Sequence, residues 1–185
     1  MTVDLDYVLM LSQRDTDIKE HILLLYFLPV VNKYKILVEI GAGQSTFALT
    51  AAVNITGGQL YSHDFLDWAI LREFAEGKGV LDKEERYQFV AGDNLVTGKT
   101  WDKPIDFIFI DSSHTYEGTK AELELWGKWV VPGGMITMHD TRTEWSDCRK
   151  AMVEFLAEQG DQYKVTHLTN QNGFSILQKK GKYEL

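Results

Sequence analysis

The sequence predicts an α/β fold with a doubly wound, mostly parallel sheet. Short apolar runs of strand character alternate with segments of helical periodicity through the middle of the chain, and parallel strands joined by helical crossovers produce this alternation. The run Ile105 to Ile110 is nearly continuous in apolar residues, as a central strand covered on both faces must be. The end of the chain instead has the pattern of an antiparallel hairpin.

The first element that we expect is a helix from Asp17. Asp17 and Glu20 have the spacing of a capping box, and the apolar residues that follow recur at helical intervals. Pro29 is expected to end or kink this helix because proline removes a backbone donor. Residues 1–34 would then form a helical cap on a core formed by residues 35–185.

The core is expected to contain strands and helices in alternation. The expected parallel strands are Ile36 to Ile40, Leu60 to Ser62, Tyr87 to Val90, Ile105 to Ile110 and Met135 to Met138. The expected helices between and after them are Ser45 to Thr56, Leu66 to Ala75, Tyr116 to Val131 and Glu144 to Glu158. In the last of these, Trp145, Cys148, Met152, Phe155 and Leu156 fall on one stripe.

Two strand-like runs close the chain, Tyr163 to Leu168 and Gly173 to Gln178. The few residues between them cannot form a helical crossover, and Asn172-Gly173 is a strong turn signal. We therefore expect an antiparallel hairpin at the end of an otherwise parallel sheet.

Composition limits the class of protein. The length of 185 residues predicts one globular domain. The formal net charge of −8 and the lack of a run of Lys or Arg argue against nucleic acid as a partner. The longest apolar stretch, Ile22 to Val31, is far shorter than the roughly 20 residues that cross a bilayer. The single cysteine, Cys148, and the acidic amino terminus favour a cytoplasmic protein without membrane association.

A glycine-rich loop follows the first expected strand. Gly41 and Gly43 allow positive φ and a close approach of a ligand to the backbone, and the helix after them offers free N–H groups. Thr46 stands where a dinucleotide-binding fingerprint has its third glycine, and no lysine follows as in a phosphate-binding loop. On this pattern alone, the alternative to a ligand-binding loop is a tight strand-to-helix turn that binds no ligand.

Acids stand near the ends of three successive strands. Glu39 lies at the end of the first, where an unpaired buried carboxylate would be costly. Asp64 follows the second, at the place where an acid accepts ribose hydroxyls in nucleotide-binding folds, and Asp93 follows the third after Gly92. Solvated loop acids are common, but three at one sheet edge favour a nucleotide-like ligand.

Together these residues resemble a known family. The segments Val38 to Thr46, Asp64, Gly92-Asp93, Phe109 to His114 and Pro132 to Gly134 are similar to the class I S-adenosylmethionine-dependent methyltransferases, which have a Rossmann-like seven-stranded sheet. The segments Asp17 to His21, Asp111 to Tyr116, His139 to Thr141 and Asn170 to Gly173 resemble, more narrowly, small bacterial and phage enzymes grouped with cephalosporin-hydroxylase-like and macrolide-sugar O-methyltransferases.

The resemblance implies S-adenosylmethionine as cofactor and a role for each matching residue. Glu39 would meet the ammonium end, directly or through water, the glycine loop would lie beside the methionine part, Asp64 would hold the ribose hydroxyls and Gly92-Asp93 would lie at the adenine. His63 is the alternative to Asp64 if the register shifts by one residue. The implied cofactor-binding residues are Glu39, Gly41, Ala42, Gly43, Ser45, Thr46, Asp64, Gly92, Asp93 and Asp111.

Four candidate catalytic residues follow the fourth and fifth strands. Methyl transfer is an in-line displacement in which the protein aligns the acceptor and often removes its proton. Asp111 and His114 follow one strand, and His139 and Asp140 follow the next. Either histidine is a candidate base, and each of the four has an alternative as a cap, a turn former or a hydrogen-bonded loop residue.

The resemblance also implies a divalent metal. Asp111 and Asp140 would hold Mg²⁺ or another divalent cation, and either Thr141 or His139 occupies the place of a further ligand. A histidine ligand would favour a transition metal such as Mn²⁺ or Fe²⁺.

The function expected from the sequence is methylation of a hydroxyl group on a small molecule, a sugar or a glycan. A nicotinamide-dependent oxidoreductase shares the glycine loop and Asp64, but it would be expected to have a third glycine and a separate substrate region. A non-catalytic nucleotide-binding protein would not be expected to have polar groups converging after strands four and five. The chain offers little material for a lid, which leaves an open acceptor site or one completed by a second subunit in a homo-oligomer.

Overall fold

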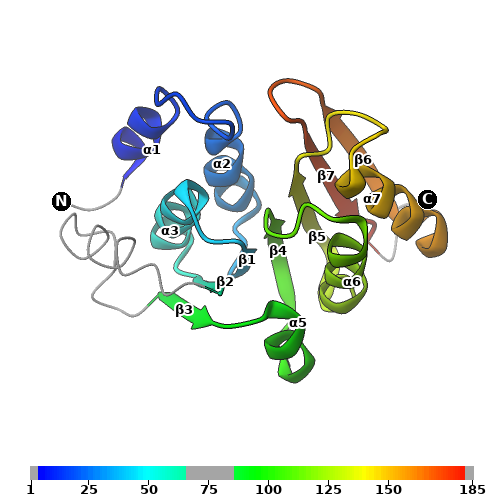
Figure 1. Cartoon of the computed structure of the whole chain (residues 1–185). Coiled ribbons are helices and arrows are strands. Elements are labelled where there is room, and N and C mark those ends of the chain that lie inside the picture. The colour runs from blue at the N-terminus through cyan, green and yellow to red at the C-terminus, as the bar shows by residue number, and fades with distance from the viewer. Residues whose placement is uncertain (1–3, 66–85, 182–185) are drawn as a thin grey trace.

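The computed structural model describes residues 4–65 and 86–181 of the chain (Figure 1). In these ranges seven strands form one sheet in the order β3-β2-β1-β4-β5-β7-β6. The strands are β1 (Ile36–Ile40), β2 (Gln59–Asp64), β3 (Tyr87–Ala91), β4 (Ile105–Ile110), β5 (Val130–His139), β6 (Tyr163–Leu168) and β7 (Phe174–Lys179). The predicted α/β class is confirmed.

The sheet is parallel from β3 to β5 and antiparallel from there on. β7 lies antiparallel between β5 and β6, with His139 of β5 opposite Phe174 and Leu168 of β6 also opposite Phe174. The predicted terminal hairpin is therefore present, and its tip returns to the carboxyl ends of β4 and β5.

Helices cover both faces of the sheet. In Figure 1, α1, α2 and α3 lie on one face, and α6 and α7 lie on the other. The helices are α1 (Leu5–Leu11), α2 (Ile22–Asn32), α3 (Gln44–Thr56), α5 (Asn94–Thr97), α6 (Tyr116–Gly127) and α7 (Asp147–Gln159), with a 3₁₀ turn at Gly98–Thr100. None of the helices in the described ranges has the length and apolarity that crossing a membrane requires.

Strand β4 shows how the sequence specifies these two layers. Phe107 and Phe109 pack in the hydrophobic cluster under α1–α3, whereas Ile108 and Ile110 pack in the cluster under α6 and α7. Because neighbouring residues of a strand point to opposite faces, a nearly continuous apolar run fills both clusters. The predicted position of Ile105 to Ile110 as a covered central strand is confirmed.

The amino-terminal prediction was wrong in two respects. Helix α2 starts at Ile22, not at Asp17, because Glu20 accepts a hydrogen bond from Asn170 Nδ2 at 2.5 Å and no side chain caps the helix. Of the two effects expected of Pro29, an end of the helix is wrong, because α2 continues past Pro29 to Asn32. Helix α1 was not predicted, although the Asp4 side chain caps it.

Other boundaries also differ from the prediction. Helix α6 ends at Gly127 instead of Val131, since Val130 already pairs with Ile105 and β5 continues through Pro132-Gly133-Gly134. Helix α7 starts at Asp147 behind the Ser146 cap, which leaves Trp145 outside the helical stripe and 78% exposed. Strand β2 extends to Asp64. The helix predicted at Leu66 to Ala75 lies outside the described residues.

Candidate active site

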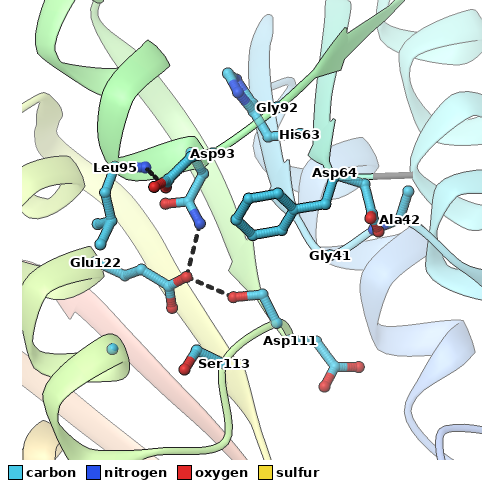
Figure 2. A pocket seen from close by; sticks show the side chains of 14 residues that line it. Gly41, Ala42, His63, Asp64, Gly92, Asp93, Leu95, Asp111, Ser113 and Glu122 are labelled. Atoms are coloured by element: carbon cyan, nitrogen blue, oxygen red, sulfur yellow. Dashed lines mark hydrogen bonds between the residues drawn. The ribbon is translucent and has the colours of Figure 1, made fainter. Parts of the chain in front are cut away.

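A pocket of about 410 Å³ opens at the carboxyl ends of β1 to β4 (Figure 2). A smaller hollow of about 200 Å³ adjoins the same loop and is bounded by residues 16–18 of the amino-terminal segment. Gly41, Ala42 and Asp111 line both spaces, so the glycine loop and the end of β4 separate them. The predicted residues Asp64, Gly92 and Asp93 line the larger space, and Gly43 and Ser45 line the smaller one.

The two glycines of the loop have different reasons to be glycine. Gly41 has φ +91°, and a Cβ there would lie 2.0 Å from the backbone oxygen of Asp111, so only glycine fits. Gly43 has φ −170° and does not use positive φ, contrary to the prediction. A Cβ on Gly43 would meet no atom within 4 Å from the other described residues beyond its chain neighbours, which leaves its surroundings open to a ligand.

Glu39 lies beneath this loop and is completely buried. Ser45 Oγ donates to one carboxylate oxygen at 2.5 Å, and Thr46 Oγ1 donates to the other at 2.7 Å, where Ser62 Oγ also donates. Burial raises the pKa of Glu39 to about 7, although these three hydroxyls oppose the rise. Glu39 does not line either space, and the Ser45 and Thr46 hydroxyls are directed at it. The hydrogen bonds from Ser45 and Thr46 to Glu39 therefore hold the glycine loop and the start of α3 in place.

This arrangement predicts a pH-dependent stability difference for Glu39→Gln. The ionised Glu39 is disfavoured in the fold, so the wild-type free energy of unfolding should fall as pH rises from about 4.5 to about 7, and the variant should lack that fall. We expect the melting temperature of Glu39→Gln, relative to wild type, to rise between pH 4.5 and pH 7.5. Exposed Glu117→Gln is the control, and an equal response of the two variants would contradict the burial argument.

Asp64 and His63 occupy distinct environments at the end of β2. Asp64 Oδ2 accepts a hydrogen bond from the Ala42 backbone N–H at 3.0 Å, at the pocket wall. His63 is buried beside Trp101 and Trp126, with Nδ1 3.0 Å from Thr97 Oγ1, and burial lowers its pKa to about 4. The geometry therefore favours Asp64, not His63, as the acid available to a ligand.

Asp93 both caps a helix and lines the larger pocket. Its Oδ1 accepts from the Leu95 backbone N–H at 2.8 Å, which caps α5, and the residue lines the pocket beside Gly92. The sequence offered a solvated loop acid as the alternative for Asp93, and the structure gives the residue a capping role instead. Any contact with a ligand would be additional to it.

The four predicted catalytic residues come together. His114 Nε2 lies 3.1 Å from Asp140 Oδ2 and 3.4 Å from Asp111 Oδ1, and His114 is the most exposed of the four. His139 Nδ1 lies 3.5 Å from Asp140 Oδ2 and 3.7 Å from Asp111 Oδ1, and its side chain is 1% exposed. Asp140 has φ +56°, and Ser146 Oγ donates to its backbone oxygen.

The charges of this group are coupled. Burial opposes a charge on His139, but Asp111 and Asp140 outweigh it and raise the pKa of His139 to about 10. The hydrogen bond with Asp111 raises the pKa of His114, against a smaller opposing effect of burial. Burial would raise the pKa of Asp111, but both histidines hold it below its ordinary value. His114 thus remains the more readily deprotonated of the two imidazoles.

Three of these residues could hold a metal ion. One ligand atom from each of Asp111, His139 and Asp140 lies within 4.8 Å of the others. Among the residues that the structure describes, neither ring nitrogen of the buried His139 has a hydrogen-bond partner of normal geometry, which suits a coordinating imidazole. Thr141 does not belong to this set, since its buried hydroxyl bonds Ser175 Oγ at 2.8 Å.

Sequence reasoning missed two buried residues at the site. His21 is fully buried, stacks on Phe174 and lies 5.5 Å from His139 between ring centroids, with Nε2 3.2 Å from Asn170 Oδ1. Glu122 of α6 is 1% exposed and lines the larger pocket. The signal for Glu122 was an acid on an otherwise buried helix face, between Thr119 and Trp126.

Comparisons with known proteins agree with this fold. Residues 38–141 match the model of a methyltransferase domain family. An O-methyltransferase from Bacillus cereus in complex with SAH is 21% identical with a TM-score of 0.72, and 95% of this chain and 90% of that one are covered. An SAH-bound methyltransferase from Podospora anserina is 18% identical, covers 95% and 87%, and has a TM-score of 0.69. The O-methyltransferase TomG from Streptomyces achromogenes in complex with SAM is 18% identical, covers 85% and 78%, and has a TM-score of 0.63.

The fold and the family match define the class. The sheet order with its terminal hairpin is that of the class I methyltransferases, and the family match runs from Val38 within β1 to Thr141, just past Asp140. The chain therefore belongs to the methyltransferase domain family, and it is an S-adenosylmethionine-dependent methyltransferase as the resemblance predicted.

Proposed function

We propose that this enzyme methylates a hydroxyl oxygen of a small molecule or sugar at the group formed by Asp111, His114, His139 and Asp140. The observation that carries this proposal is the position of Asp111, which lines both spaces and faces both histidines. The larger space would take the adenosine part of the cofactor, and the smaller space would take the methionine part. When bound, S-adenosylmethionine supplies an electrophilic methyl carbon on sulfur.

The residues of the group have complementary tasks in an O-methylation. An acceptor hydroxyl must lose its proton as its oxygen forms the bond to the methyl carbon and the carbon–sulfur bond breaks. Neutral His114 would donate its Nε2–H to the carboxylates of Asp140 and Asp111, at 3.1 and 3.4 Å, and would accept the proton of the hydroxyl at Nδ1. The two carboxylates would then stabilise the resulting imidazolium. His139 is a weaker candidate, because the same two acids raise its pKa to about 10.

A divalent cation fits the donor set of Asp111, His139 and Asp140. Such an ion would lower the pKa of the acceptor hydroxyl and orient it. Two carboxylates and one imidazole suit Mn²⁺ or another transition metal better than Mg²⁺, which prefers oxygen ligands alone. His139 would have to be deprotonated to ligate the ion, so we expect metal affinity to rise with pH.

A sugar acceptor is the class that we favour. Trp145 lies in the segment between Asp140 and α7 and is 78% exposed, so its ring is free for a sugar to stack on. The test is transfer from methyl-labelled S-adenosylmethionine into a set of glycosides, followed by mass spectrometry of the products. We expect the label in an O-methyl ether, and label recovered on nitrogen would contradict the proposal.

Cofactor binding at Asp64 gives a separate prediction. At about 100 times its dissociation constant, S-adenosylhomocysteine should stabilise the wild-type fold by roughly 2.7 kcal/mol, which is about 5 to 10 °C in melting temperature. Asp64→Ala should lose most of this shift, because the acid at the pocket wall would bind the ribose hydroxyls. Asp102→Ala, at an exposed acid, is the control. A larger shift with NAD than with S-adenosylhomocysteine would contradict the assignment of the pocket.

A further inference from the structure

The turn that carries Asp140 is held by hydrogen bonds to its backbone. Asp140 has φ +56°, a left-handed conformation that costs free energy in residues other than glycine. Ser146 Oγ donates to the backbone oxygen of Asp140, and Arg149 Nη1 donates to that of Thr141 at 3.2 Å. The place of the Asp140 carboxylate, with Oδ2 3.1 Å from His114 Nε2, therefore depends on contacts outside the candidate site.

A series of hydrogen bonds leads from Arg149 through the terminal hairpin and back to this turn. Nη1 of Arg149 also contacts Nε2 of His167 on β6. Nδ1 of His167 lies 2.9 Å from Oγ of Ser175, its partner across the hairpin on β7, and Ser175 Oγ lies 2.8 Å from Thr141 Oγ1. Ser175 and Thr141 are fully buried, so water does not compete for their hydrogen bond. Arg149, His167, Ser175 and Thr141 thus form a closed hydrogen-bond cycle.

Donor and acceptor chemistry fixes the positions of the protons in this cycle. A guanidinium group has donors only, so Nε2 of His167 must accept from Arg149. A neutral imidazole has one donor and one acceptor, so its proton is on Nδ1, which donates to Ser175 Oγ. The hydroxyl proton of Ser175 is then free for Thr141 Oγ1. A protonated His167 would have a donor at both nitrogens and would oppose Arg149, so the cycle requires the neutral imidazole.

The surroundings of His167 favour this neutral form. Burial lowers the pKa of His167, the Arg149 guanidinium lowers it further, and a hydrogen bond to the Arg142 backbone opposes them. Because the pKa is below its ordinary value of 6.5 in the fold, protonation costs stability only as the pH falls. At pH 7.5 we expect the neutral imidazole.

We propose that His167, in its neutral form with the proton on Nδ1, is a positioning residue that holds the Asp140 turn through Arg149 and Ser175. His167 lines neither of the two spaces, so it would act only through the turn. This inference rests on the proposed role of Asp140 in the metal-binding group. Opening the cycle should weaken metal binding by about 10-fold to 100-fold, the usual effect of losing a group that orients a metal ligand.

The first measurement determines the protonation of the His167 imidazole directly. A long-range ¹H–¹⁵N correlation spectrum of labelled wild type at pH 7.5 distinguishes protonated from unprotonated imidazole nitrogens, and the spectrum of His167→Gln identifies the His167 signals by their loss. We expect a protonated Nδ1 and an unprotonated Nε2. An imidazole with its proton on Nε2, or on both nitrogens, would overturn the proposal.

The second measurement tests the coupling to Asp140 through the dissociation constant of Mn²⁺, measured by isothermal titration calorimetry at pH 7.5. His167→Phe can neither accept from Arg149 nor donate to Ser175, so it should bind Mn²⁺ at least about 10-fold more weakly and keep its affinity for S-adenosylhomocysteine. His167→Gln offers an amide oxygen to Arg149, so it should stay close to wild type. Thr166→Phe is the matched control, because it places the same aromatic ring at the exposed neighbouring position of β6.

Unchanged Mn²⁺ affinity in His167→Phe would overturn the proposal, even if the melting temperature fell, because the residue would then support only the fold. A loss in His167→Gln as large as that in His167→Phe would overturn it as well. Wild type that binds no Mn²⁺ would contradict the metal ion of the proposed function instead. Methyl transfer by the same variants would then decide the inference, with a loss of at least about 10-fold expected in His167→Phe and not in His167→Gln.

Discussion

His114→Ala is expected to lower turnover by about 10² to 10⁴, the usual contribution of a general base. Nε2 of His114 faces Asp140 and Asp111, and the side chain is 61% exposed, so an acceptor can reach the ring and transfer its proton to Nδ1. Because Asp111 raises the pKa of His114, wild-type kcat/KM should increase with pH through a pKa above 6.5. The variant should lose this acidic limb while its affinity for S-adenosylhomocysteine changes little.

His139→Ala separates the two candidate bases. His139 is buried between the same acids, so its removal should lower melting temperature and metal affinity as well as turnover. His114→Ala should leave the melting temperature close to that of wild type, because the side chain is exposed. Near-wild-type turnover of folded His114→Ala would rule out His114 as the base.

Asp140→Asn is expected to reduce turnover at least about 100-fold, because it removes one of the two carboxylates proposed to bind the metal ion. Asparagine is the suitable replacement because Asp140 has φ +56°, a conformation that asparagine adopts more readily than alanine. The backbone oxygen that receives the Ser146 hydroxyl is retained, so the fold should persist. Mn²⁺ should raise the melting temperature of wild type but not of the variant.

Chelation tests the same group without a mutation. EDTA should abolish turnover and leave S-adenosylhomocysteine affinity nearly unchanged, and added Mn²⁺ should restore turnover more effectively than Mg²⁺. Asp147→Asn is the control, because Asp147 lies at the start of α7 and pairs with Lys150. In this variant, added Mn²⁺ should still restore turnover after EDTA. Full activity in EDTA, together with a metal-free protein by elemental analysis, would show that no ion takes part.

The strands were predictable because their apolar runs must fill two layers. Ile36 to Ile40 and Ile105 to Ile110 have the same limits in the sequence prediction and in the structure. The start of α2 was not predictable from local pattern, since Glu20 binds Asn170 of the distant hairpin instead of capping a helix. The length of β5 likewise depends on the pairing of Val130 with Ile105, which no local propensity encodes.

In the candidate site, too, some residues could be located from the sequence and others only from tertiary contacts. Asp64, Asp111 and Asp140 could be located because residues that follow parallel strands meet at one edge of a sheet. The role of Glu39 as a support for the loop needed the structure, because three hydroxyls from separate positions converge on it. Glu122 reaches the pocket through the packing of α6 against the sheet, which the spacing of residues along the chain does not reveal.

The most direct test of the account is an experimental structure of the enzyme with S-adenosylhomocysteine and Mn²⁺. We predict the ribose at Asp64, the adenine beside Gly92 and Asp93, the sulfur beside Gly41 and Asp111, and the ion bound by Asp111, His139 and Asp140. A sulfur atom directed away from Asp111 and His114, or a cofactor outside the larger pocket, would contradict the account.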